Sequence, residues 1–309
     1  MSQITAKIIA DSYSAINGKR ITTFELVYPR FIHSELMTHR LFSRNAMSSR
    51  AVPIEKMLSF VRYEPALPVH WGINQPGMQA KDELLGAEQK VVADLWQEAA
   101  QGAAYFATLL SDKGLHKQVV NRILEPFQLM KTVLTSTEFD NFFWLRKHED
   151  AQPEIKELAE RMYEQLEWNK LLTVELDSGD WHTPYYEAGY WLKESETPLE
   201  DALVISSSCC AQVSYRLLDD SIEKARKVYQ RLVESTPVHA SPFEHCASPM
   251  VWCYGVDWLN ACKEFGEDVQ YQDGTTHLDQ AGNFWSGNFK SWTQYRQLIK
   301  DNVCNHYKD

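Results

Sequence analysis

Arg20-Ile-Thr-Thr-Phe-Glu-Leu-Val-Tyr28 is the most strand-like stretch of this chain, because β-branched and aromatic residues dominate it. Residues 4–13 have a similar composition, and Asn17-Gly18 lies between the two stretches. An Asn-Gly pair supplies the two residues with positive φ that a type I′ turn requires. The sequence therefore predicts a β-hairpin near the start of the chain.

A basic stretch follows this hairpin. Residues 38–50 read Thr-His-Arg-Leu-Phe-Ser-Arg-Asn-Ala-Met-Ser-Ser-Arg and contain one imidazole, three guanidinium groups and four hydroxyls, but no lysine. Basic runs are usually solvated surface. Guanidinium forks and hydroxyls also bind phosphate, and residues 239–245, His-Ala-Ser-Pro-Phe-Glu-His, supply complementary chemistry. We interpret residues 38–50 as part of a pocket for a small anion.

The helix expected next would carry part of this pocket. Pro29 ends the second strand, and Ser34 is a candidate N-cap for a helix over residues 35–43. On such a helix Glu35 and His39 share a face at i, i+4. The basic stretch would then begin on the helix and continue past its C-terminal end.

Helical spacing of apolar residues predicts further helices in the middle of the chain. Residues 81–113 form a long helix closed by Gly114, and its apolar stripe is assigned to the core. Residues 116–124 form a short helix before Pro126, on which Arg122 lies among apolar residues and needs an anionic partner.

Three more helices and a strand are expected beyond this point. The capping-box pattern of residues 135–138 opens a helix that carries Asn141 and Arg146, and another helix starts at Pro153. Residues 202–216 have strand-like composition, whereas residues 222–234 are an amphipathic helix. The expected fold class is α/β (α+β), a mixed, largely antiparallel sheet with helical segments, and residues 1–309 form a single domain with helical insertions.

Composition limits the classes of function. The formal charge of −11 argues against broad binding of nucleic acid or of an anionic membrane, since both need a basic surface. No window approaches 18 uninterrupted apolar residues, and the first residues lack the plan of a secretory signal. The six cysteines form no Cys-x-x-Cys ligand pair and are interpreted as reduced thiols. We expect a cytoplasmic protein without a resident metal.

Other chemistries remain as alternatives. Cys209-Cys210 and Cys246 are candidate nucleophiles, although tandem cysteines in an apolar stretch are usually core. His239, Glu244 and His245 are possible zinc ligands, but Pro242 between them prevents a regular helix. Neither a Gly-x-Gly-x-x-Gly fingerprint nor a P-loop is present. The remaining candidate is an anion pocket made of side chains, with room for several phosphates.

Three motifs resemble those of the flavin-dependent thymidylate synthases. The family signature is Arg-His-Arg, seven residues and Ser, and here Thr38-His39-Arg40 is followed by seven residues and Ser48. Residues 239–245 and Ala211-Gln-Val-Ser-Tyr215 resemble two further family motifs. In common family members these two motifs precede the signature, whereas here they follow it, so the order looks circularly permuted. The tail from Gly287 to Arg296 resembles phage-type members.

The resemblance implies which residues bind each ligand. Those implied to contact FAD are His39, Arg40, Ser43, Asn45, Asn141, Ser214, Ser241 and Glu244. Those implied to bind deoxyuridine monophosphate (dUMP) are Glu35, Ser48, Ser49, Arg50, Arg122 and Arg146. Arg50, Arg122 and His239 are the implied catalytic residues, with an arginine near the uracil carbonyl stabilising developing negative charge.

The implied reaction is reductive methylation of dUMP to dTMP. Methylenetetrahydrofolate gives the carbon, NADPH reduces the flavin, and no enzyme cysteine attacks the base. The implied assembly is a homotetramer whose active sites are built from several subunits.

Four departures from the family pattern leave other functions open. Thr38 stands for the first Arg, and Glu35, Ala46 and Ala51 replace the usual Gln, Glu and Tyr. Each change that adds or removes a charge alters the local field. The alternatives are a related pyrimidine nucleotide one-carbon enzyme, such as a hydroxymethylase for modified phage DNA, and a catalytically silent nucleotide-binding homologue.

Overall fold

The computed structural model describes residues 3–214, 218–251, 260, 264 and 271–304. Its main sheet has five strands in the order β3-β4-β2-β1-β5. All pairs are antiparallel except β1 with β5. The strands are β1 (Thr5–Ser14), β2 (Arg20–Pro29), β3 (Ser43–Ala46), β4 (Leu129–Ser136) and β5 (Val174–Leu176). The prediction of a mixed, largely antiparallel α/β fold is confirmed.

The predicted hairpin is β1 and β2. Gly18 in the connecting turn has a φ of 67°, which a residue without a Cβ adopts at little cost. β2 then pairs along its length with β4, so Phe24 lies opposite Leu134 and Thr23 lies opposite Thr135. Because side chains alternate across a strand, neighbouring residues in β2 serve the two faces of the sheet.

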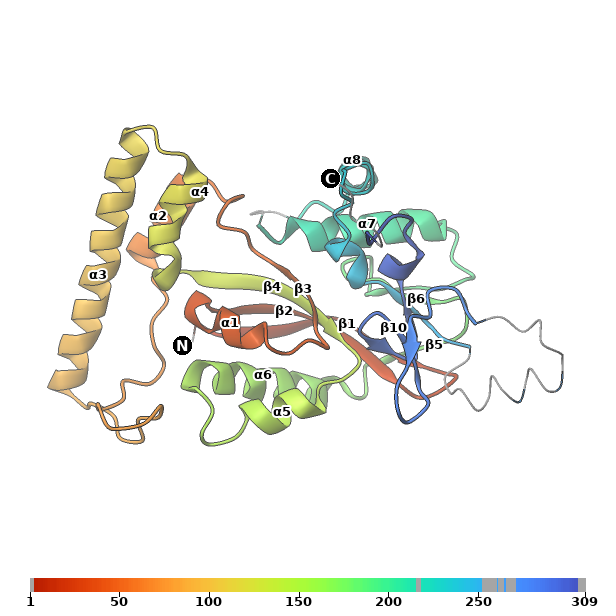
Figure 1. The fold of residues 1–309 in the computed structure, drawn as a ribbon, viewed down its shortest axis with the longest axis horizontal. Coiled ribbons are helices and arrows are strands. Elements are labelled where there is room, and N and C mark those ends of the chain that lie inside the picture. Colours follow the sequence, from red (N-terminus) through yellow and green to blue (C-terminus); the bar gives the residue numbers. More distant parts are fainter. Residues whose placement is uncertain (1–2, 215–217, 252–259, 261–263, 265–270, 305–309) are drawn as a thin grey trace.

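One face of the sheet is covered by α5 (Asp140–Arg146) and α6 (Pro153–Asn169), which lie below the strands in Figure 1. The predicted apolar face of α6 is buried, including Leu158 and Met162, in the same core as Phe24 and Leu26. The Phe24 ring also meets Phe139 edge-on at 5.7 Å. The helix predicted from Pro153 is confirmed.

The left end of the molecule in Figure 1 consists of helices. They are α2 (Ile54–Tyr63), α3 (Ala87–Asp112), α4 (Lys117–Val120) and the 3-10 helix η2 (Asn121–Phe127). The long helix was predicted, but the assignment of its stripe to the core is wrong, since Leu95 is 57% exposed and Phe106 60% exposed. No helix among the described residues is both long and apolar enough to span a membrane.

The described elements after β5 lie at the other end of the main sheet, on the right in Figure 1. The helices among them are α7 (Leu199–Ala211), α8 (Ile222–Val233) and the 3-10 turns η3 (Gln212–Ser214), η4 (Ser241–Glu244) and η5 (Tyr295–Leu298). One small sheet has the order β12-β8-β6-β7, with β6 (Trp181–His182), β7 (Tyr190–Trp191), β8 (Ala247–Pro249) and β12 (Trp292–Gln294). The other has the order β11-β10-β9, with β9 (His277–Leu278), β10 (Phe284–Ser286) and β11 (Phe289–Lys290).

The helix predicted over residues 35–43 is wrong in extent. A 3-10 turn η1 (Arg30–Ile32) leads into α1 (His33–Leu36), which stops there, and Ser43–Ala46 forms the edge strand β3. The Arg44 guanidinium donates hydrogen bonds of 3.0 Å to the carbonyls of Leu36 and His39. These bonds satisfy the Leu36 and His39 carbonyls, which a longer helix would have used for its own backbone hydrogen bonds. The pairing of β3 with β4 satisfies the backbone groups of Ser43–Ala46.

The strand predicted over residues 202–216 is also wrong, because most of this segment is α7. Residues 202–204 and 206–210 of the helix are buried, so no polar face reveals a helical period. The predicted helix over residues 222–234 is confirmed as α8.

The capping box predicted at residues 135–138 does not form. Thr135 and Ser136 end β4, and α5 starts at Asp140 after Phe139 without a side-chain cap. Ser136 Oγ instead accepts a hydrogen bond of 3.0 Å from the Glu138 amide. The strand β4 therefore includes Thr135 and Ser136, which we had predicted to begin a helix.

Candidate functional site

A cavity of about 200 Å³ lies between residues 38–42 and α5. Its lining comprises Thr38, His39, Arg40, Leu41, Phe42, Glu138, Asn141, Phe142, Leu145 and Arg146. Four of the residues that the sequence assigned to ligand binding therefore meet here, although Asn141 and Arg146 lie some hundred positions after His39 and Arg40 in the chain.

Two of the lining residues, His39 and Arg146, form a hydrogen-bonded group with Glu35. The Arg146 Nε–H donates to His39 Nε2 at 2.9 Å, and Arg146 Nη1 donates to Glu35 Oε2 at 3.1 Å. Burial, with a smaller contribution from the cations Arg146 and Arg44, lowers the pKa of His39 to about 4. The imidazole is therefore neutral near pH 7 and can accept the bond from Arg146.

Aromatic rings hold His39 in place. Its ring meets Phe142 edge-on at 4.9 Å and lies 5.8 Å from Phe42. Phe42 and Phe142 also contact each other at 5.1 Å. These buried rings fix the orientation of the imidazole, so its hydrogen bond to Arg146 is pre-organised.

The motif at residues 239–245 reaches the same region through η4. Gln294 Nε2 donates to Ser43 Oγ at 3.2 Å and to the Glu244 carbonyl at 3.3 Å. Asn288 Oδ1 accepts from Ser43 Oγ at 3.0 Å and from Gln294 Nε2 at 2.8 Å. Gln294 and Asn288 thus join β3 to η4, and sequence reasoning missed both because neither lies in a motif with an expected ligand.

Charge links these two segments as well. The half-buried Arg44 guanidinium lies in the field of Glu244, which opposes the lowering of the Arg44 pKa by burial. Glu244 also forms an ion pair with Arg296. The carboxylate implied to contact FAD is therefore held between two cations.

Asn45 offers a free acceptor beside these groups. Its Nδ2 donates to the Cys210 carbonyl at 3.2 Å, which connects β3 to the end of α7. Its Oδ1 is buried and has no hydrogen-bond partner among the described residues. A buried acceptor without a donor costs free energy unless a ligand or water supplies one.

A second cationic group surrounds Glu125. Its Oε1 accepts from Ser49 Oγ at 2.7 Å and lies 2.8 Å from Arg122 Nη1 and 3.0 Å from Arg30 Nη2. Arg122 therefore has the anionic partner that we predicted, Glu125. Its side chain is 51% exposed, however, so the predicted burial among apolar residues is wrong. Arg50 is exposed nearby in sequence, and neither Arg50 nor Arg122 lines the 200 Å³ cavity.

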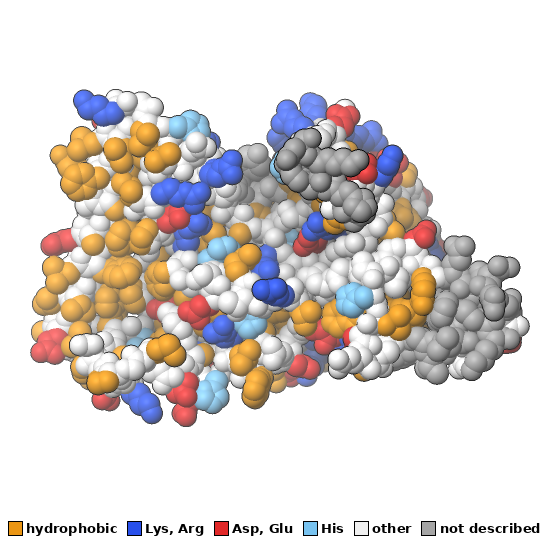
Figure 2. All heavy atoms as spheres, viewed as in Figure 1, with side chains coloured by type: hydrophobic (Ala, Val, Ile, Leu, Met, Phe, Trp, Pro, Cys, Tyr) orange, Lys and Arg blue, Asp and Glu red, His pale blue; other side chains and the backbone are white. Residues whose placement is uncertain are grey.

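Figure 2 shows that the surface is hollowed between the part built on α2–α4 and the part built on α7 and α8. Lys and Arg side chains lie along this hollow. A basic strip on a protein with a charge of −11 is a local feature, as expected for an anion site.

The remaining predicted residues lie at the edge of this region. Ser48 is exposed, and so are His239 and Ser241, whereas Glu244 is half-buried. The side chain of Ser214, in η3, lies outside the described residues. Their assignment to ligands stays a prediction.

A buried chain of hydrogen bonds lies behind η4. His182 Nδ1 bonds Ser12 Oγ at 3.0 Å, and its Nε2 bonds Thr23 Oγ1 at 2.8 Å. Thr23 Oγ1 bonds Thr135 Oγ1 at 2.7 Å, which in turn bonds His245 Nδ1 at 2.8 Å. The last residue of the 239–245 motif is thus anchored to the main sheet. His182 was missed because an isolated histidine in a short strand carries no pattern.

Burial determines the charge of His182 and His245, the two histidines in this chain of hydrogen bonds. It lowers the pKa of His182 and of His245 to about 3, with a smaller lowering of the His245 pKa by His182. Asp11 partly opposes the shift of His182. Both rings are therefore neutral at pH 7, and His245 Nε2 has no partner among the described residues.

The cysteine alternative finds no support in burial or pKa. Cys209, Cys210 and Cys246 are buried, and burial raises their pKa values, to about 12 for Cys209 and about 11 for Cys246. A reactive cysteine needs the opposite shift. Cys253 and Cys262 lie outside the described residues.

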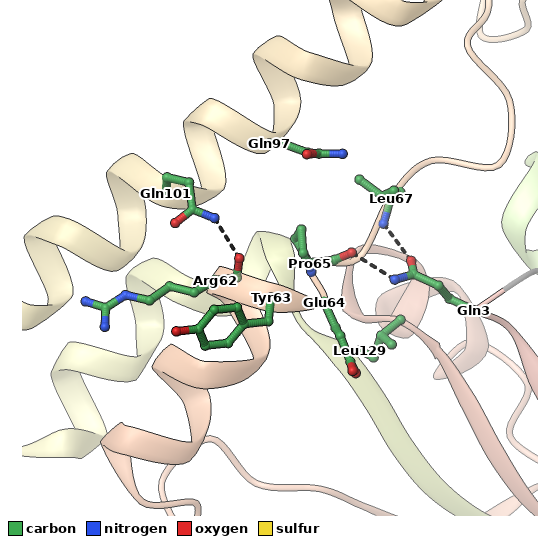
Figure 3. A pocket seen from close by; sticks show the side chains of 9 residues that line it. All are labelled: Gln3, Arg62, Tyr63, Glu64, Pro65, Leu67, Gln97, Gln101 and Leu129. Atoms are coloured by element: carbon green, nitrogen blue, oxygen red, sulfur yellow. Dashed lines mark hydrogen bonds between the residues drawn. The ribbon is translucent and has the colours of Figure 1, made fainter.

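A larger cavity of about 430 Å³ lies at the junction of α2 and α3 (Figure 3). Figure 3 shows its lining residues, which are Gln3, Arg62, Tyr63, Glu64, Pro65, Leu67, Gln97, Gln101 and Leu129. The Gln3 side chain bonds the Pro65 carbonyl and the Leu67 amide, and Gln101 bonds the Arg62 carbonyl. None of the residues assigned to ligands from the sequence lies in it.

Comparison with known proteins gives one match to a family model and one curated relative of note. Residues 6–168 match the family described as thymidylate synthase complementing protein. A flavin-dependent thymidylate synthase from Aquifex aeolicus (strain VF5) is 27% identical over 146 residues. That alignment spans 46% of this chain and 44% of the relative's length.

Solved structures with similarity to the chain include two methylases. A UMP/dUMP methylase PolB from Streptomyces cacaoi, bound with 5-Br UMP, is 19% identical over 55% of this chain and 91% of its own, with a TM-score of 0.45. A flavin-dependent thymidylate synthase ThyX from Helicobacter pylori, complexed with FAD and dUMP, is 19% identical over 50% of this chain and 71% of its own, with a TM-score of 0.35.

The match to the family model spans more than half of the 309 residues and includes β1 to β4, residues 38–50 and α5. The motifs at residues 211–215 and 239–245 lie outside this match. The chain belongs to the thymidylate synthase complementing protein family.

Proposed function

We propose that this protein is a flavin-dependent thymidylate synthase, which methylates dUMP to dTMP with methylenetetrahydrofolate as the carbon donor and NADPH as the reductant. The observation that carries the proposal is the meeting of three distant segments at one place. The 38–50 stretch joins α5 through the His39–Arg146 hydrogen bond. It joins η4 through Gln294, whose Nε2 donates to both Ser43 Oγ and the Glu244 carbonyl.

The donor set suits FAD. Arg40 is an exposed cation that lines the 200 Å³ cavity, and Ser43 and Asn141 add polar groups to the region. The buried Asn45 Oδ1 lacks a donor within the described residues, so it is available to a ligand N–H. The residues proposed to hold FAD are His39, Arg40, Ser43, Asn45, Asn141, Ser214, Ser241 and Glu244. The flavin, when bound, supplies the redox chemistry.

The cations suit a nucleotide phosphate. The residues proposed to form the dUMP site are Glu35, Ser48, Ser49, Arg50, Arg122 and Arg146, with Glu35 acting on the nucleotide through its ion pair with Arg146. Arg50 is exposed, whereas Arg122 and Arg146 each have a carboxylate partner, Glu125 and Glu35. Binding at these two arginines therefore requires the phosphate to compete with a carboxylate or to share the guanidinium with it.

The protein's own part in the reaction is orientation and electrostatic stabilisation. The neutral His39 ring fixes the Arg146 guanidinium through its Nε. Arg50 or Arg122 would stabilise negative charge that develops at the uracil carbonyl, and His239 stays a candidate catalytic residue. The buried cysteines have raised pKa values and take no part.

A second candidate is a related pyrimidine nucleotide one-carbon enzyme, for example a hydroxymethylase. The Glu35–Arg146 ion pair favours it, because Glu35 replaces the neutral glutamine of the family pattern and removes one net positive charge from the pocket. Mass spectrometry of the nucleotide after reaction separates the two, since the hydroxymethyl product carries one more oxygen than the methyl product. A nucleotide that stays unmodified, with flavin bound to the protein, would favour a silent homologue.

A further inference from the structure

The two faces of α3 have an unusual distribution of side chains. Its inner face is mostly small, since Ala100, Ala104 and Ala107 are fully buried against the fold, with Trp96 as the large residue that also packs inward. Its outer face carries the large ones, with Leu95 57%, Phe106 60% and Leu109 43% exposed. Figure 1 shows α3 at the margin of the molecule, with α2 and α4 on its inner side, and Figure 2 shows apolar side chains there. An exposed apolar face of this length indicates an interaction surface.

Residues on this outer face follow a heptad pattern. Alternating steps of four and three residues connect a set that we call the α3 seam, namely Glu88, Val92, Leu95, Ala99, Gly102, Phe106, Leu109 and Lys113. This spacing keeps one stripe of a helix facing a partner helix along its whole length. In the structure every seam residue is exposed or partly exposed. Among the described elements, α2, α4 and η2 pack against α3, and Figure 1 shows α2 and α4 on its inner side.

The seam is complementary to itself when it is read in reverse. About a midpoint between residues 100 and 101, Leu95 lies opposite Phe106, and Ala99 lies opposite Gly102. Val92 then faces Leu109, and the acidic Glu88 faces the basic Lys113. A two-fold axis through that midpoint would form each of these pairs twice, as in an isologous dimer. The opposite charges at the two ends specify an antiparallel copy of this helix rather than an arbitrary apolar surface.

Gly102 supplies independent support. A glycine within a helix costs about 1 kcal/mol relative to alanine. A Cβ added to Gly102 would meet no atom within 4 Å, so the chain's own packing does not require a glycine here. A second helix crossing closest to this point would require it, because small residues let two backbones approach.

We propose that α3 pairs with α3 of a second copy of this chain, antiparallel about a two-fold axis between residues 100 and 101. Leu95 and Phe106 of the two copies form the apolar centre, and Ala99 and Gly102 lie at the closest approach. The Glu88–Lys113 pairs close the two ends.

The test is sedimentation of the full chain over a range of concentrations. Wild type is expected to form dimers, or a larger assembly with an even number of copies. Gly102→Leu is expected to weaken the association at least about 100-fold, because the bulky side chain blocks close approach. The same substitution in the monomer enters open space, so circular dichroism and thermal melting should show an intact fold. Lys90→Leu, an exposed position of α3 outside the seam, is the matched control and should retain the wild-type mass.

Charge reversal tests the antiparallel register. Glu88→Lys places like charges together at both ends and should weaken association about tenfold, whereas Glu88→Lys with Lys113→Glu should restore it. A monomeric wild type, or a folded Gly102→Leu variant with the wild-type mass, would overturn the proposal. Failure of the double reversal to restore the association lost in Glu88→Lys would overturn the antiparallel register. These outcomes do not depend on enzymatic activity.

Discussion

Arg146 donates a hydrogen bond from its Nε–H to His39 Nε2 at 2.9 Å, which joins the end of α5 to the basic stretch of residues 38–50. The bond needs a neutral imidazole, and the pKa of His39, lowered to about 4 mainly by burial, meets that need. Arg146 is thereby oriented by one neutral ring and one carboxylate, Glu35.

Arg50→Ala is expected to weaken dUMP binding about 10- to 100-fold, the range for loss of a charged hydrogen bond. Arg50 is exposed and has no ion partner in the described part of the chain, so its loss disturbs little else. Titration calorimetry checks this, with Arg62→Ala as the control because Arg62 lies at the separate 430 Å³ cavity. Equal affinities of wild type and Arg50→Ala would remove Arg50 from the substrate site.

Glu35→Gln is expected to strengthen dUMP binding about fivefold, since a partly exposed ion pair is worth about 1 kcal/mol. The change frees the Arg146 guanidinium from a carboxylate 3.1 Å away without removing the side chain. Arg146→Ala should weaken binding in the same assay. If Glu35→Gln binds the nucleotide no better than wild type does, the proposed competition between Glu35 and phosphate is wrong.

Acidification is expected to destabilise the protein through His182 and His245. Their pKa values are about 3 in the folded protein, below the ordinary value of 6.5, so the unfolded chain binds more protons below pH 6.5. Stability is therefore full above pH 6.5 and falls between pH 6.5 and 3, by about 2 kcal/mol for each ring from pH 7 to 5.

Denaturant unfolding at pH 7 and at pH 5 measures this loss. His182→Gln removes one titrating group, so its stability should fall less between the two pH values than that of wild type. An identical fall in wild type and variant would show that His182 does not titrate on unfolding.

Thr135→Val is expected to reduce the free energy of unfolding by about 1 to 3 kcal/mol, because it leaves His245 Nδ1 and Thr23 Oγ1 without their shared partner. Valine has nearly the same shape, so little packing is lost. Thermal or denaturant melting checks the change. A variant as stable as wild type would mean that the chain of hydrogen bonds does not anchor η4.

Alkylation at pH 7 is expected to leave activity unchanged and to label Cys304 while sparing Cys209, Cys210 and Cys246. The last three are buried and have raised pKa values, whereas Cys304 is exposed. Peptide mass spectrometry locates the label. Inactivation that parallels labelling of Cys209 or Cys246 would revive the cysteine mechanism.

Local sequence signals predicted the elements whose faces differ in polarity. Asn-Gly in the turn identifies the hairpin, because it lies between two stretches rich in β-branched and aromatic residues. The helices α6 and α8 each have one apolar side, so the helical period of their apolar residues identifies them. α7 has buried residues on nearly all sides, and no period separates it from a strand. For the basic stretch we predicted a helix that would end at residue 43. Residues 43–46 instead form β3, because pairing with β4 outweighs helix propensity there.

The candidate site was predictable where a motif carried it. His39 and Arg40, from the signature motif, line one cavity together with Asn141 and Arg146 of α5, and the assignment of these residues to ligands stays a prediction. Asn288 and Gln294 lie in the tail that resembles phage-type members, which implied no role for either, and His182 is isolated, so only the folded chain reveals their partners. The outward direction of the α3 stripe was missed because periodicity shows that a helix has an apolar face, not whether its own fold covers that face.

The most direct test of the proposed function is to incubate the purified protein with FAD, NADPH, methylenetetrahydrofolate and dUMP and to follow the nucleotide by mass spectrometry. We expect dTMP, with product formation that requires both FAD and the folate. An unmodified nucleotide from protein that has bound both flavin and dUMP would contradict the assignment as a thymidylate synthase.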